Sequence, residues 1–144
     1  MFSGFNISAS GMTAQRLRMD IIANNIANID TTRTETGGPY RRQLPVFEER
    51  RNRPFSFFLN EKMNSRGKGG VQVSAIIEDQ SPFKIIYNPA HPDADEDGYV
   101  SMPNVDIVTE MVDMIDASRA YEANVTALNS LKNMALKALE IGKG

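Results

Sequence analysis

The chain has 144 residues, of which 41% are hydrophobic and 24% charged, and its formal net charge at pH 7 is −2. A chain of this length is expected to form one domain, with or without appendages. Cysteine is absent, which excludes disulfides and thiolate metal sites. There is no apolar run of 18 residues, so we expect no direct membrane insertion. The first residues lack the features of a cleaved secretory signal, so we expect any export to use another route.

Charge is unevenly distributed along the chain. Residues 33–68 carry nine Lys or Arg against four Glu, whereas residues 78–116 carry ten Asp or Glu against one Lys. Two interpretations stay open. The two segments form separate solvated surfaces, or they form complementary faces that meet within one chain or between copies.

The first segment, residues 3–29, is predicted to be a helix with an apolar seam at heptad spacing. Its two rows are Phe5, Met12, Met19 and Ile26, and Ser8, Gln15, Ile22 and Ile29. Gly4 and Gly11 are expected to weaken the first turns by about 1 kcal/mol each relative to Ala. The helix ends in NNIANIDTT, which places Asn24, Asn25 and Asn28 at a position where amides compete for backbone hydrogen bonds.

Residues 32–100 are expected to form a small β-rich unit. They hold six of the ten glycines and all the prolines except Pro103. The alternation over residues 71–77 predicts a strand, and residues 84–87 and 40–47 are further strand candidates. The dipeptides Gly37-Gly38, Gly69-Gly70 and Asn88-Pro89 separate them.

The last segment, residues 104–141, contains no proline or glycine and is predicted to be one long helix. Asn104 is the expected N-cap, and Gly142 is expected to end the helix. At 1.5 Å per residue the helix would span roughly 57 Å, which is too long for a compact globule of this size. Its apolar seam has two rows, namely Ile107, Met114, Tyr121, Leu128 and Ala135, and Met111, Ser118, Val125, Lys132 and Leu139.

The predicted fold class is therefore α+β. We expect the N- and C-terminal helices to pair as an antiparallel coiled-coil layer, with a small β-rich middle segment between them in sequence. Both helices need apolar partners, either each other or further copies of the chain.

Several motifs suggest chemistry but are incomplete. DADEDG at residues 93–98 matches the first half of a calcium loop, but Asn104 stands where the bidentate Glu is required. His91 is the only histidine and has no nucleophile motif beside it. Arginines at 50, 51 and 53 precede Phe55, Phe57 and Phe58, but no nucleic-acid-binding signature accompanies them. We expect no enzyme activity, no cofactor, no metal and no nucleic-acid partner.

Three stretches together resemble the bacterial flagellar basal-body rod proteins, specifically the proximal-rod FlgC type. They are ANNIANIDTT, PYRRQLPVF and the long run GYVSMPNVDIVTEMVDMIDASRAYEANVTALNSLKNMALKAL. GGVQVSAIIEDQSPFKIIYNPAHPDADEDGYV is similar to the same type. Residues 50–68 depart from the pattern and are interpreted as a variable insert.

The resemblance implies a structural subunit of the flagellar basal body that is exported by the flagellar type III apparatus without a cleaved signal. Its expected partners are other rod proteins, copies of itself and the export apparatus. The terminal helices would polymerise around the export channel and transmit torque. The implied divisions are an assembly helix at 1–31, a β-rich middle at 32–100 and a long helix at 101–144 that packs with the first.

We expect the seam residues and asparagines of both helices to form the assembly interface. One hypothesis is that Asn24, Asn25 and Asn28 fix the stagger between subunits, because a buried amide in a helix seam specifies register. The alternative is that they only cap and fray the helix end. A second function class, a soluble coiled-coil adaptor that responds to calcium through residues 93–97, also stays open. The expected interface residues are Met12, Met19, Ile22, Asn24, Asn25, Ile26, Asn28, Ile29, Ile107, Met111, Met114, Tyr121, Asn124, Val125, Leu128 and Asn129.

Overall fold

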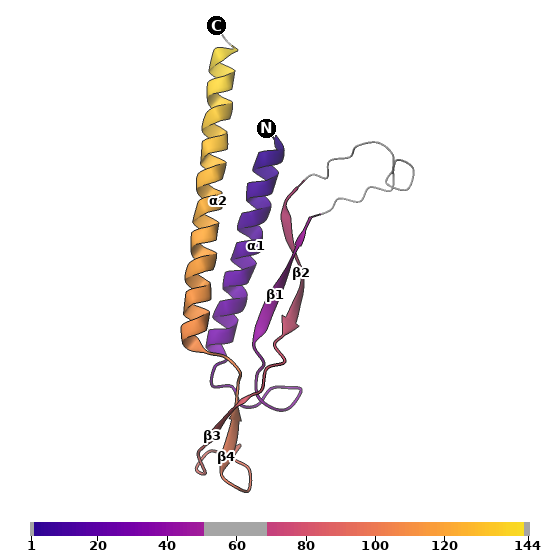
Figure 1. Cartoon of the computed structure of the whole chain (residues 1–144), viewed down its shortest axis with the longest axis vertical. Helices are drawn as coiled ribbons and strands as arrows, with labels where there is room; N and C mark the ends of the chain where they lie inside the picture. The colour runs from indigo at the N-terminus through magenta and orange to yellow at the C-terminus, as the bar shows by residue number, and fades with distance from the viewer. Residues whose placement is uncertain (1, 51–68, 143–144) are drawn as a thin grey trace, which may run out of the picture.

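A computed structural model describes residues 2–50 and 69–142. In chain order the elements are helix α1 (Phe2–Ala27), strands β1 (Gln43–Glu49), β2 (Val71–Glu78), β3 (Lys84–Tyr87) and β4 (Tyr99–Met102), and helix α2 (Ile107–Ile141). The molecule is elongated, with the two helices and the β1–β2 hairpin side by side and the β3–β4 hairpin below them (Figure 1). The predicted α+β class is confirmed. Most of the expected variable insert, from residue 51 to 68, lies outside the described residues.

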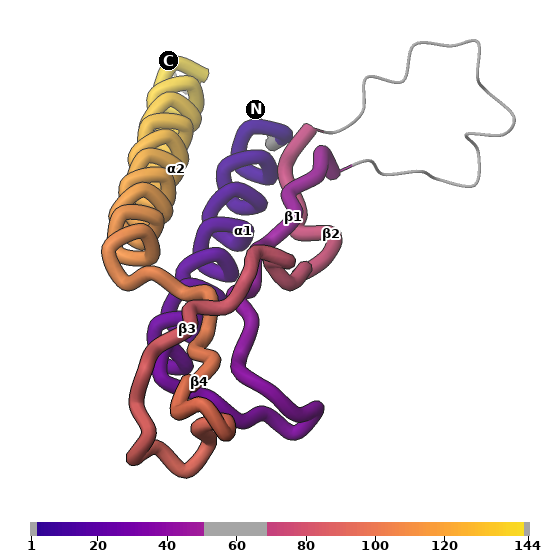
Figure 2. Tube along the Cα trace, turned by 60° about the horizontal axis from the view of Figure 1, so that its bottom comes forward, coloured from indigo at the N-terminus to yellow at the C-terminus, as the bar shows by residue number. Residues whose placement is uncertain are grey.

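Helices α1 and α2 pack antiparallel along the whole of α1, as the sequence predicted. Gly4 lies against Leu131, Gly11 against Asn124, and Asn25 against Glu110, so each step of seven toward the C-terminus of α1 is matched by a step toward the N-terminus of α2. The β1–β2 hairpin covers the other side of α1 (Figures 1 and 2). Helix α1 is thus the middle layer of a three-layer stack.

The two sheets are antiparallel hairpins of two strands each. In the first, β1 pairs with β2 from Gln43↔Glu78 to Glu49↔Val71, with an irregularity between Val46 and Phe47. In the second, β3 pairs with β4, and the rings of Tyr87 and Tyr99 meet edge to face with their centroids 5.3 Å apart. Strand β4 has no counterpart among the predicted elements. The hairpins supply little core, because Ile76 and Ile85 remain 51% and 70% exposed.

The N-terminal cap of α2 differs from the prediction, whereas its C-terminal cap agrees with it. Asp106, not Asn104, is the N-cap, because its carboxylate accepts a hydrogen bond of 3.1 Å from the backbone N–H of Thr109. The amide of Asn104 is used elsewhere: it accepts from the backbone N–H of Arg42 and donates to the carbonyl of Asp79. At the other end Gly142 caps the helix, as predicted. Neither described helix is apolar over a stretch long enough to cross a membrane.

Candidate assembly surface and its polar junction

Glycines in α1 bring the two helices close together. A Cβ atom placed on Gly11 would lie 2.7 Å from Oδ1 of Asn124, and one on Gly4 would lie 3.0 Å from Cδ1 of Leu131. Both distances are shorter than ordinary van der Waals contact, so a larger residue at either position would require the side chain of Asn124 or Leu131 to shift. These glycines lower the helical propensity of α1, but they allow α1 to pack closely on α2.

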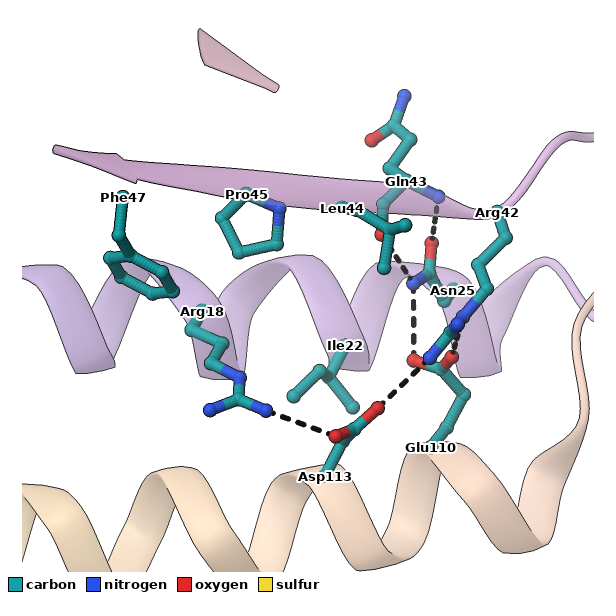
Figure 3. Close-up of a pocket in the computed structure, with 10 residues that line it drawn as sticks. All are labelled: Arg18, Ile22, Asn25, Arg42, Gln43, Leu44, Pro45, Phe47, Glu110 and Asp113. Carbon is teal, nitrogen blue, oxygen red and sulfur yellow. Dashed lines mark hydrogen bonds and ion pairs between the residues drawn. The ribbon is translucent and has the colours of Figure 1, made fainter. Parts of the chain in front are cut away.

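A polar junction, formed by Asn25, Arg42, Glu110 and Asp113, joins α1, the start of β1 and α2 (Figure 3). Glu110 is 0% exposed and Asn25 is 1% exposed. The carboxylate of Glu110 accepts from Nδ2 of Asn25 at 3.1 Å and from Nε of Arg42 at 2.5 Å. A buried carboxylate is tolerated only when it is paired and hydrogen-bonded, and here both conditions are met.

Asn25 uses its whole side chain within its own chain. Besides the bond to Glu110, its Nδ2 donates to the carbonyl of Gln43 at 2.9 Å. Its Oδ1 accepts from the backbone N–H of Gln43 and from the hydroxyl of Tyr40, each at 2.9 Å. An amide offers two donors and two acceptor sites, and all four are engaged. Asn25 therefore fixes the position of β1 on α1 and has no free group to offer a neighbouring subunit.

Two arginines connect the junction to the surface through one carboxylate. Asp113 accepts from Nη2 of Arg42 and from Nη2 of Arg18, each at 2.9 Å. These three side chains border a hollow of about 350 Å³ whose other wall is apolar (Figure 3). The apolar residues of that wall are Ile22, Leu44, Pro45 and Phe47. The hollow brings together ion-paired and apolar groups, which suits packing rather than acid–base catalysis.

The pKa values of Tyr40, which donates to Asn25, and of Asp93, in the acidic turn, are shifted from their ordinary values. Burial raises the pKa of Tyr40 above its ordinary value of 10.0, and the carboxylates of Glu110 and Glu78 raise it further. The hydrogen bond from the hydroxyl of Thr32 is the main cause that lowers the pKa of Asp93 below 3.8, and Arg33 adds to it. These shifts follow from partners within the chain.

In the described part of the chain, the basic segment meets the acidic segment through Arg33 and Arg42, which favours complementary faces within one chain for these residues. Arg33 pairs with Asp93, and Arg42 pairs with Asp79, Glu110 and Asp113. A carboxylate of the acidic turn also stabilises the turn itself: Oδ1 of Asp95 accepts from the backbone N–H groups of residues 97 and 99. Among the described residues no group of three His, Cys, Asp or Glu is arranged to hold a metal ion.

The predicted interface residues on α1 and in the turn that follows it are mostly covered within the chain. Ile22 is buried, and Met12, Met19, Ile26 and Ile29 are half-buried. Asn24 is exposed and donates weakly to Tyr40 and Gln43 at 3.3 and 3.5 Å. Asn28, which is half-buried, donates to the carbonyl of Asn24 and accepts from Thr31. The asparagines thus hold the helix exit and the loop after it, and their proposed contacts with other subunits stay a prediction.

The predicted interface residues on α2 divide into two groups. Ile107 and Met111 are 46% and 55% exposed, and Asn129 is also exposed. The others are half-buried. Asn124 lies in the contact with α1, opposite Gly11, and the rest lie on its flank, namely Met114, Tyr121, Val125 and Leu128. Helix α1 instead contacts the row Glu110, Asn124 and Leu131, which is rotated away from the predicted seam. The predicted seam is therefore partly open along its length.

Sequence patterns missed Arg42, Glu110 and Asp113 as functional residues. Each looks like a surface charge in the sequence, since none belongs to an apolar row. No sequence pattern marked Glu110, because its burial, like that of Ala117 seven positions later, appears only in the fold. Once buried, a carboxylate needs a partner of opposite charge, which Arg42 supplies.

Two family models match the two ends of the chain. One, described as "Flagella basal body rod protein", matches residues 5–33. The other, "Flagellar basal body rod FlgEFG protein C-terminal", matches residues 96–141. These ranges contain most of α1 and all of α2. The two family models therefore match the helix pair of a flagellar basal-body rod protein.

Curated relatives narrow the class further. The chain is 51% identical to the flagellar basal-body rod protein FlgC of Borreliella burgdorferi, over 100% of this chain and 99% of the relative. It is 50% identical to FlgC of Bacillus subtilis, over 99% and 98%, and 41% identical to FlgC of Salmonella typhimurium, over 96% of each. The chain therefore belongs to the FlgC-type flagellar basal-body rod proteins. It is a structural protein of the flagellar basal body and not an enzyme, and it assembles with other basal-body components.

Proposed function

We propose that the chain builds the proximal rod by polymerising through its terminal helices, with copies of itself and with other rod proteins. In that rod the helix pairs surround the export channel and the assembled subunits transmit torque. The chain reaches its place through the flagellar type III export apparatus. The proposed divisions are the assembly helix at 1–31, the β-rich middle at 32–100 and the long helix at 101–144.

The observation that carries this proposal is the open apolar seam on α2. Ile107 and Met111 lie one turn apart on the same face and are about half exposed. Exposed apolar side chains that form a row on a helix mark a surface that another helix covers. Fully burying a methionine stabilises an interface by roughly 1.5–3 kcal/mol, so several such residues supply the affinity of a subunit contact. Family membership favours this function over a calcium-responsive coiled-coil adaptor.

The polar junction supports the proposal through rigidity. A subunit that transmits torque must not hinge where its helices meet its outer segment. The junction connects α1, β1 and α2 by bonds among Asn25, Arg42 and Glu110, all of them buried or half-buried. Such a network holds one geometry, because each broken bond leaves a polar group buried without a partner.

Substitution at the open seam tests the proposal. Met111→Glu adds a charge where a neighbouring helix is expected, while Ala123→Glu adds the same charge at an exposed position of α2 outside the predicted seam. Both purified variants are expected to keep the helicity and melting temperature of the wild type. Cells that carry Met111→Glu are expected to lack rods and not to swim, whereas Ala123→Glu cells swim. Normal swimming with Met111→Glu would reject the open seam as the assembly surface.

A further inference from the structure

Helix α2 carries a second apolar stripe, on the side turned away from α1. This outer stripe consists of Val108, Val112 and Ile115, which are 65%, 53% and 51% exposed. Their spacing of four and three residues places them on one face of the helix. The outer stripe adjoins the exposed end of the predicted seam, because Met111 lies three residues from Val108 and four from Ile115. The described part of the chain leaves both uncovered.

The C-terminal end of α2 is also apolar and uncovered. Helix α1 begins at Phe2 and Gly4 lies opposite Leu131, so α2 continues past the end of its partner (Figure 1). This overhang, residues 134–141, carries Met134, Leu136, Leu139 and Ile141, which are 56%, 49%, 66% and 82% exposed. One helix therefore has two apolar ends, and its exposed middle, from 122 to 130, is mostly polar or small.

Charges beside the two ends are complementary. Asp116 and Arg119 flank the outer stripe, and Lys137 and Glu140 lie in the overhang. Each pair is spaced by three residues, and the order of signs is reversed between them. None of the four has an ion pair or hydrogen bond with another side chain among the described residues, and all four are exposed. The second pair follows the first at 21 positions, which is three heptads, so the same face returns.

We infer that the overhang of one copy lies parallel on the outer stripe of α2 of a second copy, with Lys137 opposite Asp116 and Glu140 opposite Arg119. This inference rests on the proposed assembly function and names which surfaces meet. Copies related in this way are staggered by about 32 Å along the helix. The contact is heterologous, because two different surfaces meet, and it does not close, so it extends end to end.

Two single variants of the full chain test the contact by sedimentation velocity. Val112→Glu blocks the outer stripe and leaves the overhang intact, and Met134→Glu, one turn before Lys137 on the same face, does the reverse. The wild type is expected to form larger species as its concentration rises, and each variant alone is expected to stay a monomer. An equimolar mixture is expected to form a dimer and to stop there, because one intact surface of each kind remains and both outer ends are blocked.

Charge reversal gives a second test that leaves the apolar residues unchanged. Asp116→Lys with Arg119→Glu is expected to weaken association about tenfold, since two exposed ion pairs become like-charge contacts. Adding Lys137→Glu and Glu140→Lys to the same chain is expected to restore it. Failure of this restoration, a mixture of the single variants that stays monomeric, or single variants that still polymerise would overturn the inference. A monomeric wild type would overturn it too, and the proposed function would still stand if the Met111→Glu cells lack rods and do not swim.

Discussion

Replacing Asn25 by leucine removes the centre of the polar junction. The side chain of Asn25 is 1% exposed and makes four hydrogen bonds that join α1 to β1 and α2. Leucine supplies none of these bonds. The two backbone groups of Gln43 and one oxygen of Glu110 would each lose a partner in a buried or half-buried position.

The expected cost follows from those groups. A buried polar group without its partner costs about 1–3 kcal/mol, and burial of the leucine side chain offsets part of the total. For three such groups we expect a net loss of about 3–5 kcal/mol. That is a large share of the stability of a small domain, which is typically about 5–15 kcal/mol. At about 3 °C per kcal/mol, the melting temperature is expected to fall by about 9–15 °C.

Urea unfolding of the purified chain, followed by circular dichroism at 222 nm, measures this loss. The matched control is Asn6→Leu, the same chemical change at an exposed position of α1. Asn25→Leu is expected to lower the transition midpoint strongly with an unchanged slope, and Asn6→Leu is expected to change the free energy by less than about 0.5 kcal/mol. If Asn25→Leu loses no more than the control does, the junction does not hold the fold together.

Three further outcomes are expected. Gly11→Ala should destabilise the chain, because the added Cβ would meet Oδ1 of Asn124. In an Asn124→Ala background the same change should stabilise the chain by about 1 kcal/mol, and a double-mutant cycle measured by urea unfolding checks this. Because the folded pKa of Tyr40 is raised, stability should fall as pH rises above 10, and Tyr40→Phe should flatten that decline in thermal melts between pH 8 and 11. Because the folded pKa of Asp93 is lowered, its contribution to stability is present above about pH 4 and is lost in stronger acid. Asp93→Asn should therefore make the acid decline in stability shallower in thermal melts from pH 6 to 2.

The long elements could be predicted from the sequence because their signals are local. An uninterrupted run without proline or glycine predicted α2 from residue 104, and the helix begins at Ile107. The alternation of residues 71–77 predicted β2, which spans Val71–Glu78. Strand β4 was missed because it is four residues long and exists only through pairing with β3. Short strands are decided by their partners, which sequence periodicity does not contain.

The contact between the helices shows why the site could be predicted only in part. Heptad counting selected rows of large apolar residues, whereas α1 and α2 meet through Gly4 and Gly11. Small residues look like defects in a propensity argument and become the closest contacts in the folded molecule. The role of Asn25 depended on Arg42 and Glu110, which lie 17 and 85 positions away. Nothing local in the sequence indicates such a pairing.

Thiol accessibility at position 111 tests whether the open seam of α2 is covered in the rod. The chain contains no cysteine, so Met111→Cys gives a single reactive site. A maleimide reagent is expected to label this thiol rapidly in the purified chain, where Met111 is 55% exposed, and slowly in isolated basal bodies. Equal labelling rates in the two states would contradict the account, because the seam would then remain open to solvent in the assembled rod.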